Sequence, residues 1–301
     1  MFSPASYQHL RFEGRPGGVG APGELLDGPP PRAPQRGPST RPEPQLDAPQ
    51  RRLVEAALTV AGLDPAQYRT GPFVRRMPAV LRALQCPDIE TACVRVSGSV
   101  EDARRALDAL LIGHTEPFRD PKTFVELRSR VLGPLSAGRS GLSVWSVACS
   151  AGVELASAAL LLAERGLLGG SRLRGSDCRA KAIETARLLS LQRLAASLPP
   201  ELAELRPLLD DPAFGAAIAT VEWVVENALT AEPDPAGWDV VFCRNLAIYL
   251  DSSSSERLWA RLVAALAPGG VLVTGRAERP PRHLPLERVA KSIFRRTRGA
   301  V

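Results

Sequence analysis

From Leu142 onward, short β-prone runs alternate with longer Ala/Leu-rich stretches of helical period. In Leu142–Glu154 a β-prone run gives way to small residues and then to a helix pattern from about Val153 to Arg165. Such a turn lets the backbone approach a ligand, although an ordinary strand–turn–helix unit has the same pattern. With helices between the strands, the pattern predicts an α/β fold, a doubly wound and mostly parallel sheet. The strands are expected near residues 143–147, 173–176, 221–225, 239–243 and 271–275, with a last antiparallel edge strand from Arg288–Arg296.

Upstream, apolar residues recur at helical spacing and predict a small all-helical domain over residues 51–113. Val100–Ile112 is expected to be its third amphipathic helix. Proline lacks a backbone donor, so the helix through Arg75–Leu84 is expected to begin at or just before Pro78. The earlier apolar positions are Leu53, Val54, Ala57 and Leu58, followed by Val80, Leu81 and Leu84.

Residues 1–50 have a different composition, with eleven of the 28 prolines, seven glycines and almost no periodic apolar residues. Such a segment buries too little apolar surface to offset the entropy of ordering it. The composition therefore predicts a disordered tail ahead of the helical domain.

Charge and cysteine content limit the class of protein. The formal charge is +6, and residues 276–301 carry eight Arg and Lys against two acids, which indicates either an anionic partner or a solvated basic edge. The five cysteines form no CxxC pair, which is typical of reduced, buried thiols. No run approaches the roughly 18 apolar residues of a membrane span, and no apolar leader segment is present. These features predict a cytoplasmic protein without membrane insertion.

Polar residues follow the ends of four predicted strands. Asp177 ends the second strand, where a carboxylate accepts ribose hydroxyls in nucleotide-binding sheets, although it also suits a helix cap. Glu154, in the first turn of the helix after the first strand, either complements the helix dipole or binds a ligand. Asn227 and Asn245 follow the third and fourth strands. Because these strand ends meet at one rim, the four residues together predict a binding site.

Three ordered motifs carry a resemblance to a known family. Trp238–Asp251 reads Trp-Asp-Val-Val-Phe-Cys-Arg-Asn-Leu-Ala-Ile-Tyr-Leu-Asp, Thr115–Asp120 reads Thr-Glu-Pro-Phe-Arg-Asp, and the run from Val144 begins Val-Trp-Ser-Val-Ala-Cys-Ser-Ala-Gly-Val-Glu. They resemble motifs of the CheR family, the methyltransferases that esterify glutamates of bacterial chemotaxis receptors. The resemblance covers roughly residues 51–296, implies a Rossmann-like methyltransferase fold, and places the catalytic domain at 114–301.

The resemblance also implies S-adenosylmethionine as cofactor, S-adenosylhomocysteine as product and an acidic helical segment of a receptor or signalling protein as partner. Asp177 would hold the ribose hydroxyls and Glu154 the amino group of the methionine part. Arg119 and Tyr249 match the catalytic residues beside the methyl group and the accepting carboxylate. A carboxylate is already nucleophilic at neutral pH, so methyl transfer to it needs orientation rather than a general base. The cofactor-binding residues implied are Thr115, Arg119, Glu154, Asp177, Asn227, Arg244 and Asn245; no metal ligands are expected.

The chain also departs from the family pattern. Ala148 stands where the family has its first glycine, Val153 replaces the first acid of Gly-Glu-Glu, and the Asp-Ile-Asp after the second strand is Asp177-Cys178-Arg179. Residues 188–220 are Leu/Ala/Pro-rich and helical in pattern, where many family members carry a small β-subdomain that docks on a receptor tail.

Three functions therefore remain open. The first is methylation of protein glutamates, with Arg75, Arg76 and Arg82 either gripping the acidic partner helix or forming a solvated face. The second is a degenerate, catalytically weak binding module, and the third is methylation of a small carboxylate metabolite. Methylation of nucleic acid is disfavoured, because Arg244-Asn245-Leu246 replaces the Asn/Asp-Pro-Pro-Tyr type of motif after the fourth strand.

Overall fold

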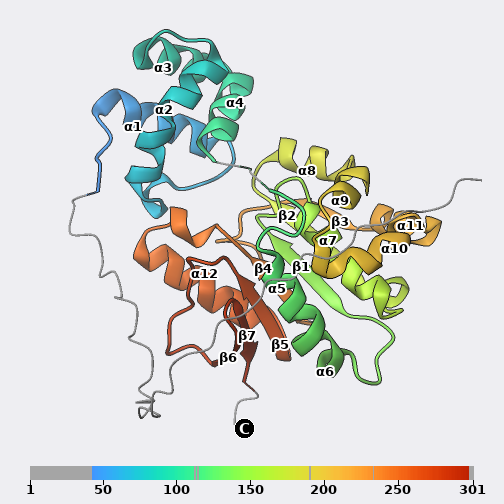
Figure 1. Cartoon of the computed structure of the whole chain (residues 1–301). Helices are drawn as coiled ribbons and strands as arrows, with labels where there is room; N and C mark the ends of the chain where they lie inside the picture. The colour runs from blue at the N-terminus through green and yellow to red at the C-terminus, as the bar shows by residue number, and fades with distance from the viewer. Residues whose placement is uncertain (1–42, 112, 114, 190, 233, 298–301) are drawn as a thin grey trace, which may run out of the picture. The chain divides into compact units, whose positions relative to one another are not determined.

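A computed structural model of the chain describes residues 43–111, 113, 115–189, 191–232 and 234–297 (Figure 1). Of its two units, Met1–Pro42 and Glu43–Val301, only the second contains described residues. Most of the predicted tail thus lies outside the described residues. Its end belongs to the fold, because the first helix begins at Ala48, where Asp47 and Gln50 form a capping box.

Four α-helices occupy the part of the chain predicted to be all-helical. Three of them begin at a side-chain cap: the Ser99 side chain, for example, accepts a hydrogen bond from the Asp102 N–H at the start of α4. Their apolar residues recur at helical spacing and are buried, as expected, Leu53, Leu58 and Leu84 among them. The helices are α1 (Ala48–Thr59), α2 (Thr70–Leu84), α3 (Ile89–Gly98) and α4 (Val100–Leu110).

The expected helix start near Pro78 is wrong. Helix α2 begins at Thr70 and passes through Pro78. Phe73, Met77 and Val80 are buried on one face of the helix, whereas Pro78 is exposed. An interior proline costs about 3 kcal/mol, and each fully buried apolar side chain returns about 1.5–3 kcal/mol. Burial of the apolar face therefore holds the helix together across the proline.

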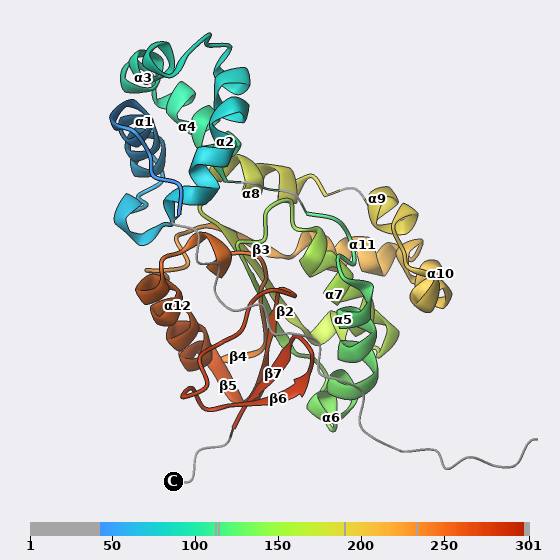
Figure 2. The same ribbon diagram turned by 60° about the vertical axis from the view of Figure 1, so that its left-hand side comes forward.

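The predicted sheet is present, with seven strands in the order β3-β2-β1-β4-β5-β7-β6 (Figure 2). Strands β3, β2, β1, β4 and β5 are parallel, which confirms the doubly wound, mostly parallel fold. The strands are β1 (Ser143–Val147), β2 (Arg172–Asp177), β3 (Glu222–Val225), β4 (Trp238–Cys243), β5 (Leu266–Thr274), β6 (Leu286–Ala290) and β7 (Ile293–Arg296).

The basic C-terminal stretch forms an antiparallel hairpin rather than a single edge strand. Strand β7 pairs with β5, and β6 lies at the sheet edge beyond it. The alternation of apolar and basic residues indicated the strand character, but not the reversal between Ala290 and Ile293.

The two faces of the sheet carry different cores. Trp145 and Val241 face a cluster that includes helix α12 and the N-terminal helices, whereas Val144 and Val240 face the cluster around α7. This alternation is that of buried strands covered on both faces. Figures 1 and 2 show α12 on one side of the sheet and α5 and α7 on the other. The remaining α-helices are α5 (Pro121–Glu126), α6 (Gly133–Ser136), α7 (Val153–Glu164), α8 (Ala180–Arg187), α9 (Leu191–Ala196), α10 (Arg206–Leu209), α11 (Pro212–Ala219) and α12 (Ser252–Ala265).

The segment expected to be helical in place of a β-subdomain is helical. It contains α9, a 3₁₀ helix over Pro200–Leu205, α10 and α11. Leu194, Leu202 and Phe214 are buried in the same cluster as Leu160 and Leu161 of α7. The segment is therefore a cover for the sheet and α7.

Among the described residues, no helix combines the length and the apolar character needed to cross a bilayer.

Candidate functional site

The loop between β1 and α7 follows a strained path. Ala148 and Ser150 have positive φ angles of 52° and 50°, and Gly152 has 75°. At Gly152 glycine is needed, because a Cβ atom there would lie 2.4 Å from the Trp223 ring. The path of the turn at the carboxyl end of β1 therefore depends on glycine at position 152.

Asp177 ends β2 and is nearly buried beside this loop. Its Oδ2 accepts a hydrogen bond from the Ser150 N–H at 3.0 Å, and its Oδ1 accepts one from the Arg179 N–H at 3.0 Å. The Arg179 guanidinium also donates to it, through Nε at 3.1 Å and Nη2 at 3.3 Å. Asp177 thus caps the turn into α8 and forms an ion pair with Arg179. It also lines a cavity.

Glu154, in the first turn of α7, belongs to a second ion-pair network. Its carboxylate accepts hydrogen bonds from the Ser146 hydroxyl at 3.0 Å and from Arg244 Nη1 at 2.9 Å. Arg244 Nη2 in turn donates to Asp120 Oδ2 at 2.7 Å and to the Arg119 carbonyl at 2.6 Å. Arg244 therefore ties the segment before α5 to the first turn of α7 and fixes the direction of both carboxylates.

The loop after β4 is held by Glu278. Asn245 has a φ of 64°, and its N–H donates to Glu278 Oε2 at 2.6 Å, while the Ala247 N–H donates to Oε1 at 2.8 Å. Burial raises the pKa of the Glu278 carboxyl, although its backbone hydrogen bonds act in the opposite direction. Glu278 therefore shapes the 3₁₀ turn Ala247–Tyr249 that presents Tyr249.

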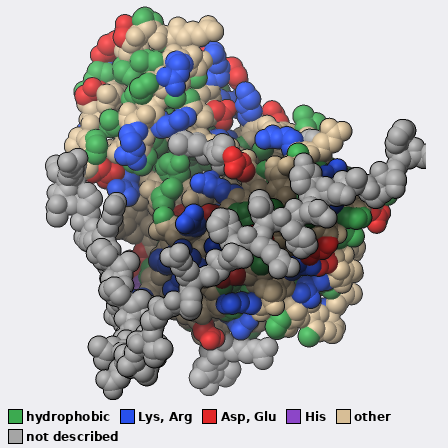
Figure 3. Space-filling model, viewed as in Figure 1, with side chains coloured by type: hydrophobic (Ala, Val, Ile, Leu, Met, Phe, Trp, Pro, Cys, Tyr) green, Lys and Arg blue, Asp and Glu red, His purple; other side chains and the backbone are tan. Residues whose placement is uncertain are grey.

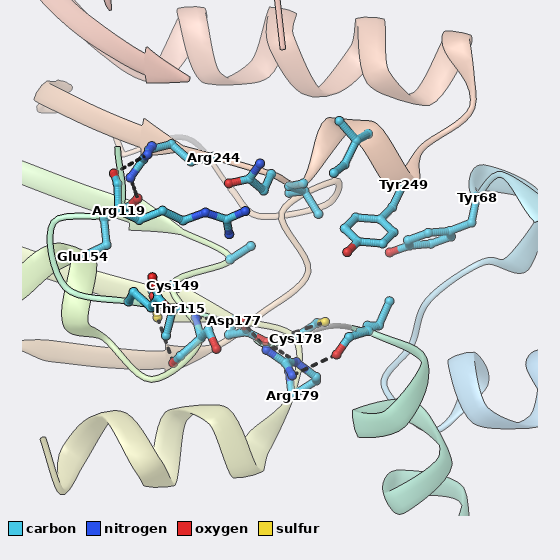
Figure 4. A pocket seen from close by; sticks show the side chains of 17 residues that line it. Tyr68, Thr115, Arg119, Cys149, Glu154, Asp177, Cys178, Arg179, Arg244 and Tyr249 are labelled. Atoms are coloured by element: carbon cyan, nitrogen blue, oxygen red, sulfur yellow. Dashed lines mark hydrogen bonds and ion pairs between the residues drawn. The ribbon is translucent and has the colours of Figure 1, made fainter. Parts of the chain in front are cut away.

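A cavity of about 400 Å³ opens at the carboxyl ends of β1, β2 and β4 (Figure 4). Cavities of a few hundred Å³ are typical of sites for small molecules. Seven of the residues predicted for the site line it: Thr115, Arg119, Glu154, Asp177, Arg244, Asn245 and Tyr249.

Asn227 lies apart from these seven. It lines an adjoining cavity of about 20 Å³, whose walls include Ala148 and Asp177, so the two spaces share residues. Its Oδ1 accepts a hydrogen bond from the Leu229 N–H at 2.9 Å, which shapes the loop after β3.

The helical region closes one side of the cavity with Tyr68. Tyr68 and Leu250 form an isolated antiparallel bridge, the Arg69 N–H donates to the Tyr249 carbonyl at 2.9 Å, and the Asp251 N–H donates to the Gln67 carbonyl at 2.9 Å. Figure 4 shows the rings of Tyr68 and Tyr249 beside each other. Burial raises the pKa of both tyrosines, and the pKa of Tyr249 is held down in part by nearby Arg76, Arg119, Arg179 and Arg75.

Two thiols also line the cavity. Burial and then the Asp177 charge raise the pKa of Cys178 to about 12, and the same causes raise the pKa of Cys149 well above its usual value. Both thiols therefore stay protonated at neutral pH, and neither has the thiolate that nucleophilic catalysis needs.

Sequence reasoning did not single out Tyr68 or Arg179 as site residues. The signal for Arg179 was present, because it stands where the family has the second acid of Asp-Ile-Asp. Tyr68 offered no signal of this kind, since it reaches the cavity through a contact between distant parts of the chain.

Comparison with known proteins decides which family has this site. Residues 113–293, more than half of the chain, match the family described as "CheR methyltransferase, SAM binding domain". The chain belongs to the CheR methyltransferase family. It is 27% identical over 245 residues to a chemotaxis protein methyltransferase of Vibrio parahaemolyticus, covering 75% of this chain and 86% of the relative. A chemotaxis protein methyltransferase of Salmonella typhimurium is 28% identical over 246 residues, with 77% and 84% covered.

Two further comparisons are more limited, one in the share of the other protein's length and the other in its TM-score. An uncharacterized 104.1 kDa protein of Rhodobacter capsulatus is 27% identical over 246 residues, which are 75% of this chain and a quarter (25%) of that protein. Among solved structures, the N-methyltransferase NodS of Bradyrhizobium japonicum in complex with S-adenosylhomocysteine aligns with a TM-score of 0.33 and 17% identity, covering 66% of this chain and 71% of that one.

S-adenosylmethionine is the cofactor of this CheR domain, and the hydrogen-bond acceptors of the cavity fit it. The ligand offers an ammonium group and a ribose diol, and the cavity offers the carboxylates of Glu154 and Asp177. Each Glu154 oxygen accepts one protein hydrogen bond, which leaves each one a lone pair for an ammonium group.

Proposed function

We propose that this methyltransferase of the CheR type transfers a methyl group from S-adenosylmethionine to glutamate carboxylates of a receptor or another signalling protein. One observation carries the proposal: Arg119 and Tyr249 line the same cavity as Glu154 and Asp177. Figure 4 shows the Arg119 guanidinium extending across the cavity in the direction of Tyr249. An acceptor carboxylate held there would lie beside the space available to the cofactor.

The residue types suit an in-line displacement. Bound S-adenosylmethionine supplies an electrophilic methyl group on a positively charged sulfur. The acceptor carboxylate is ionised at neutral pH, so its oxygen forms the new C–O bond as the C–S bond breaks, and no proton moves. Arg119 would hold the carboxylate in a fork geometry, and the phenol of Tyr249, which is protonated at neutral pH, would donate a hydrogen bond.

The remaining residues would bind the cofactor. Glu154 would take the ammonium group and Asp177 the ribose hydroxyls, as the chemistry of their carboxylates favours. Arg244 would act as the counter-ion that orients Glu154. Thr115, Asn227 and Asn245 are proposed as further contacts, from the walls of the main and the adjoining cavity.

The proposed acceptor is an acidic helical segment laid along α2. Arg75 and Arg82 are exposed on this helix, and the charges of Arg75 and Arg76 lie near enough to Tyr249 to oppose the rise that burial causes in its pKa. Figure 3 shows Lys and Arg side chains over the helical region and toward the middle of the same face. Acidic side chains of a partner would find complementary charge there. We place the reaction in the cytoplasm, since the described residues include all five cysteines and none is in a disulfide.

A small carboxylic acid is the second candidate acceptor. It is favoured by the helical segment α9–α11, which stands where many family members carry a receptor-docking β-subdomain. A metabolite acceptor would need only the cavity and not the arginines of α2.

The test is methyl transfer to the cytoplasmic fragment of a chemotaxis receptor, measured as methanol released by base, which is diagnostic of a methyl ester. Arg119→Ala is expected to lower the rate about 100-fold, because the acceptor loses its orientation. Asp177→Ala is expected to weaken binding of S-adenosylhomocysteine about tenfold, because the diol loses a charged acceptor.

Arg193→Ala is the matched control, since Arg193 is exposed on α9 and lies outside both cavities. It should leave transfer and binding unchanged. Full transfer by Arg119→Ala would contradict the assigned role. Cofactor binding without transfer to any receptor fragment, but with esterification of small acids, would favour the second candidate, and the absence of all transfer would favour a binding module.

A further inference from the structure

The carboxylate of Asp177 has no lone pair to spare. A carboxylate offers about four acceptor positions. Two are taken by backbone N–H groups, those of Ser150 and Arg179, and two by the Arg179 side chain through Nε and Nη2. The Cys178 thiol adds a long contact at 3.9 Å. A ribose diol needs two of these positions, so two donors have to leave.

The guanidinium is the donor able to leave. The Ser150 and Arg179 N–H groups belong to the turns that begin α7 and α8, so releasing them would break the loops themselves. The Arg179 side chain can turn about its own bonds without moving the backbone. Its displacement exchanges one set of hydrogen bonds to Asp177 for another.

A second set of partners for Arg179 already lies within reach, in the last turn of helix α4 and just after it. Arg179 Nη1 donates to the Leu111 carbonyl at 3.2 Å and lies 3.9 Å from Asp108 Oδ1. Beyond them is a cavity of about 630 Å³ lined by Asp108, Lys181 and Glu184 as well as Arg179. The guanidinium therefore has both an acceptor and space outside the cofactor cavity.

We infer that Arg179 is an affinity-determining residue of the methyl-transfer site: it competes with the ribose hydroxyls for Asp177 and turns to Asp108 when the cofactor binds. The inference rests on Asp177 as the ribose ligand, as proposed above. It makes the affinity for the cofactor depend on a residue of the helical region that lines the neighbouring cavity rather than the cofactor cavity.

The experiment is calorimetric titration of the full chain with S-adenosylhomocysteine, which needs no acceptor. Arg179→Met keeps the apolar stem of this buried side chain but removes the competitor, so binding should tighten about three- to tenfold. Asp108→Asn weakens the alternative partner and should loosen binding about threefold in the parent chain. In the Arg179→Met background the same Asp108 change should have no effect.

The direction of change separates this role from a structural one. A residue that only supports the fold would give weaker binding when replaced, so Arg179→Met binding equal to or weaker than the parent overturns the inference. Arg179→Gln, with a thermal melt beside each titration, serves where the Met variant does not fold. An Asp108→Asn effect of equal size in both backgrounds also overturns it.

The outcomes also separate this inference from the proposed function. If binding does not tighten in Arg179→Met while the parent chain transfers methyl groups normally, the inferred competition is wrong and the proposed function stands. If binding tightens but no acceptor is methylated, the inferred competition is supported and the proposed function is wrong.

Discussion

Ala148 occupies a backbone conformation that glycine adopts far more readily. Its φ of 52° lies in the left-handed region, where a Cβ atom costs about 1–2 kcal/mol. Ser150 and Gly152 in the same turn also have positive φ angles, so alternate positions of the turn adopt this geometry. The glycine of related sequences at this position is thus explained by the path of the chain, and Ala148 holds the same path under strain.

Ala148→Gly should therefore stabilise the chain despite the greater freedom of glycine in the unfolded state. The strain removed exceeds the entropy cost of about 0.4–1 kcal/mol, so we expect a gain of up to about 1 kcal/mol and a melting temperature higher by about 2–4 °C. Differential scanning calorimetry measures it. Ala151→Gly, in the same turn but without a positive φ, is the matched control and should not stabilise.

At the residue scale the sequence located most of the site but not its bonding. The three motifs contain six of the seven predicted residues that line the cavity, and Asp177 joins them because the carboxyl ends of parallel strands meet at one rim. The pairing of Arg179 with Asp177 was not predictable, since it depends on a side-chain direction that spacing along the chain does not determine.

Helix α12 depends on its N-cap. Asp251 accepts hydrogen bonds from the N–H groups of Ser253 and Ser254 and from both hydroxyls. Partial burial acts to raise its pKa, but these hydrogen bonds outweigh it and lower the pKa to about 2. An unfolded aspartate titrates near pH 3.9. The stabilisation by the charged cap is thus complete above about pH 4 and is lost as the pH falls toward 2.

Asp251→Ala should cost about 1 kcal/mol at neutral pH, seen as an earlier midpoint in urea. Asp251→Asn keeps a capping oxygen without the titration, so its stability should change less than that of the parent chain between pH 4 and pH 2. An equal loss in the parent chain and in Asp251→Asn would contradict the role of the charged cap.

At the element scale, period and composition predicted β1 to β4 to within a residue or two, whereas β5 begins at Leu266, five residues before the expected start near residue 271. Buried parallel strands combine β-branched residues with clear flanking turns, which makes them easy to recognise. The start of α2 was missed because proline was weighed as a local signal, whereas burial of Phe73 and Met77 is a tertiary effect. For the hairpin of β6 and β7 the sequence predicted strand structure but only one strand, because the position of the reversal also depends on tertiary pairing.

The helices and the sheet share one of the two cores. Leu53 and Leu84 of the helical region belong to the same buried cluster as Trp238 and Trp259. A shared core makes unfolding cooperative. Tryptophan fluorescence reports on the sheet region alone, because all four tryptophans, Trp145, Trp223, Trp238 and Trp259, follow residue 142.

We therefore expect one transition in guanidinium chloride, with the fluorescence midpoint equal to that of far-ultraviolet circular dichroism. Tyr68→Ala should shift both midpoints together, at a cost of about 3 kcal/mol for a truncated buried aromatic. Tyr68→Phe keeps the packing and is the control, expected to move them far less. Two separated midpoints in the parent chain would show that the helices unfold independently.

The backbone links between residues 67–69 and 249–251 have a consequence for how this protein can change over evolution. The Tyr249 carbonyl accepts a hydrogen bond from the Arg69 N–H, and the Asp251 N–H donates one to the Gln67 carbonyl, so the segment that precedes α2 holds the backbone on both sides of Leu250. An insertion or deletion between Tyr68 and α2 would therefore shift the acceptor end of the cavity. Surface segments such as α9–α11 have no such connection to Tyr249. Gain and loss of residues among descendants should accumulate there, while the spacing around Tyr68 stays constant.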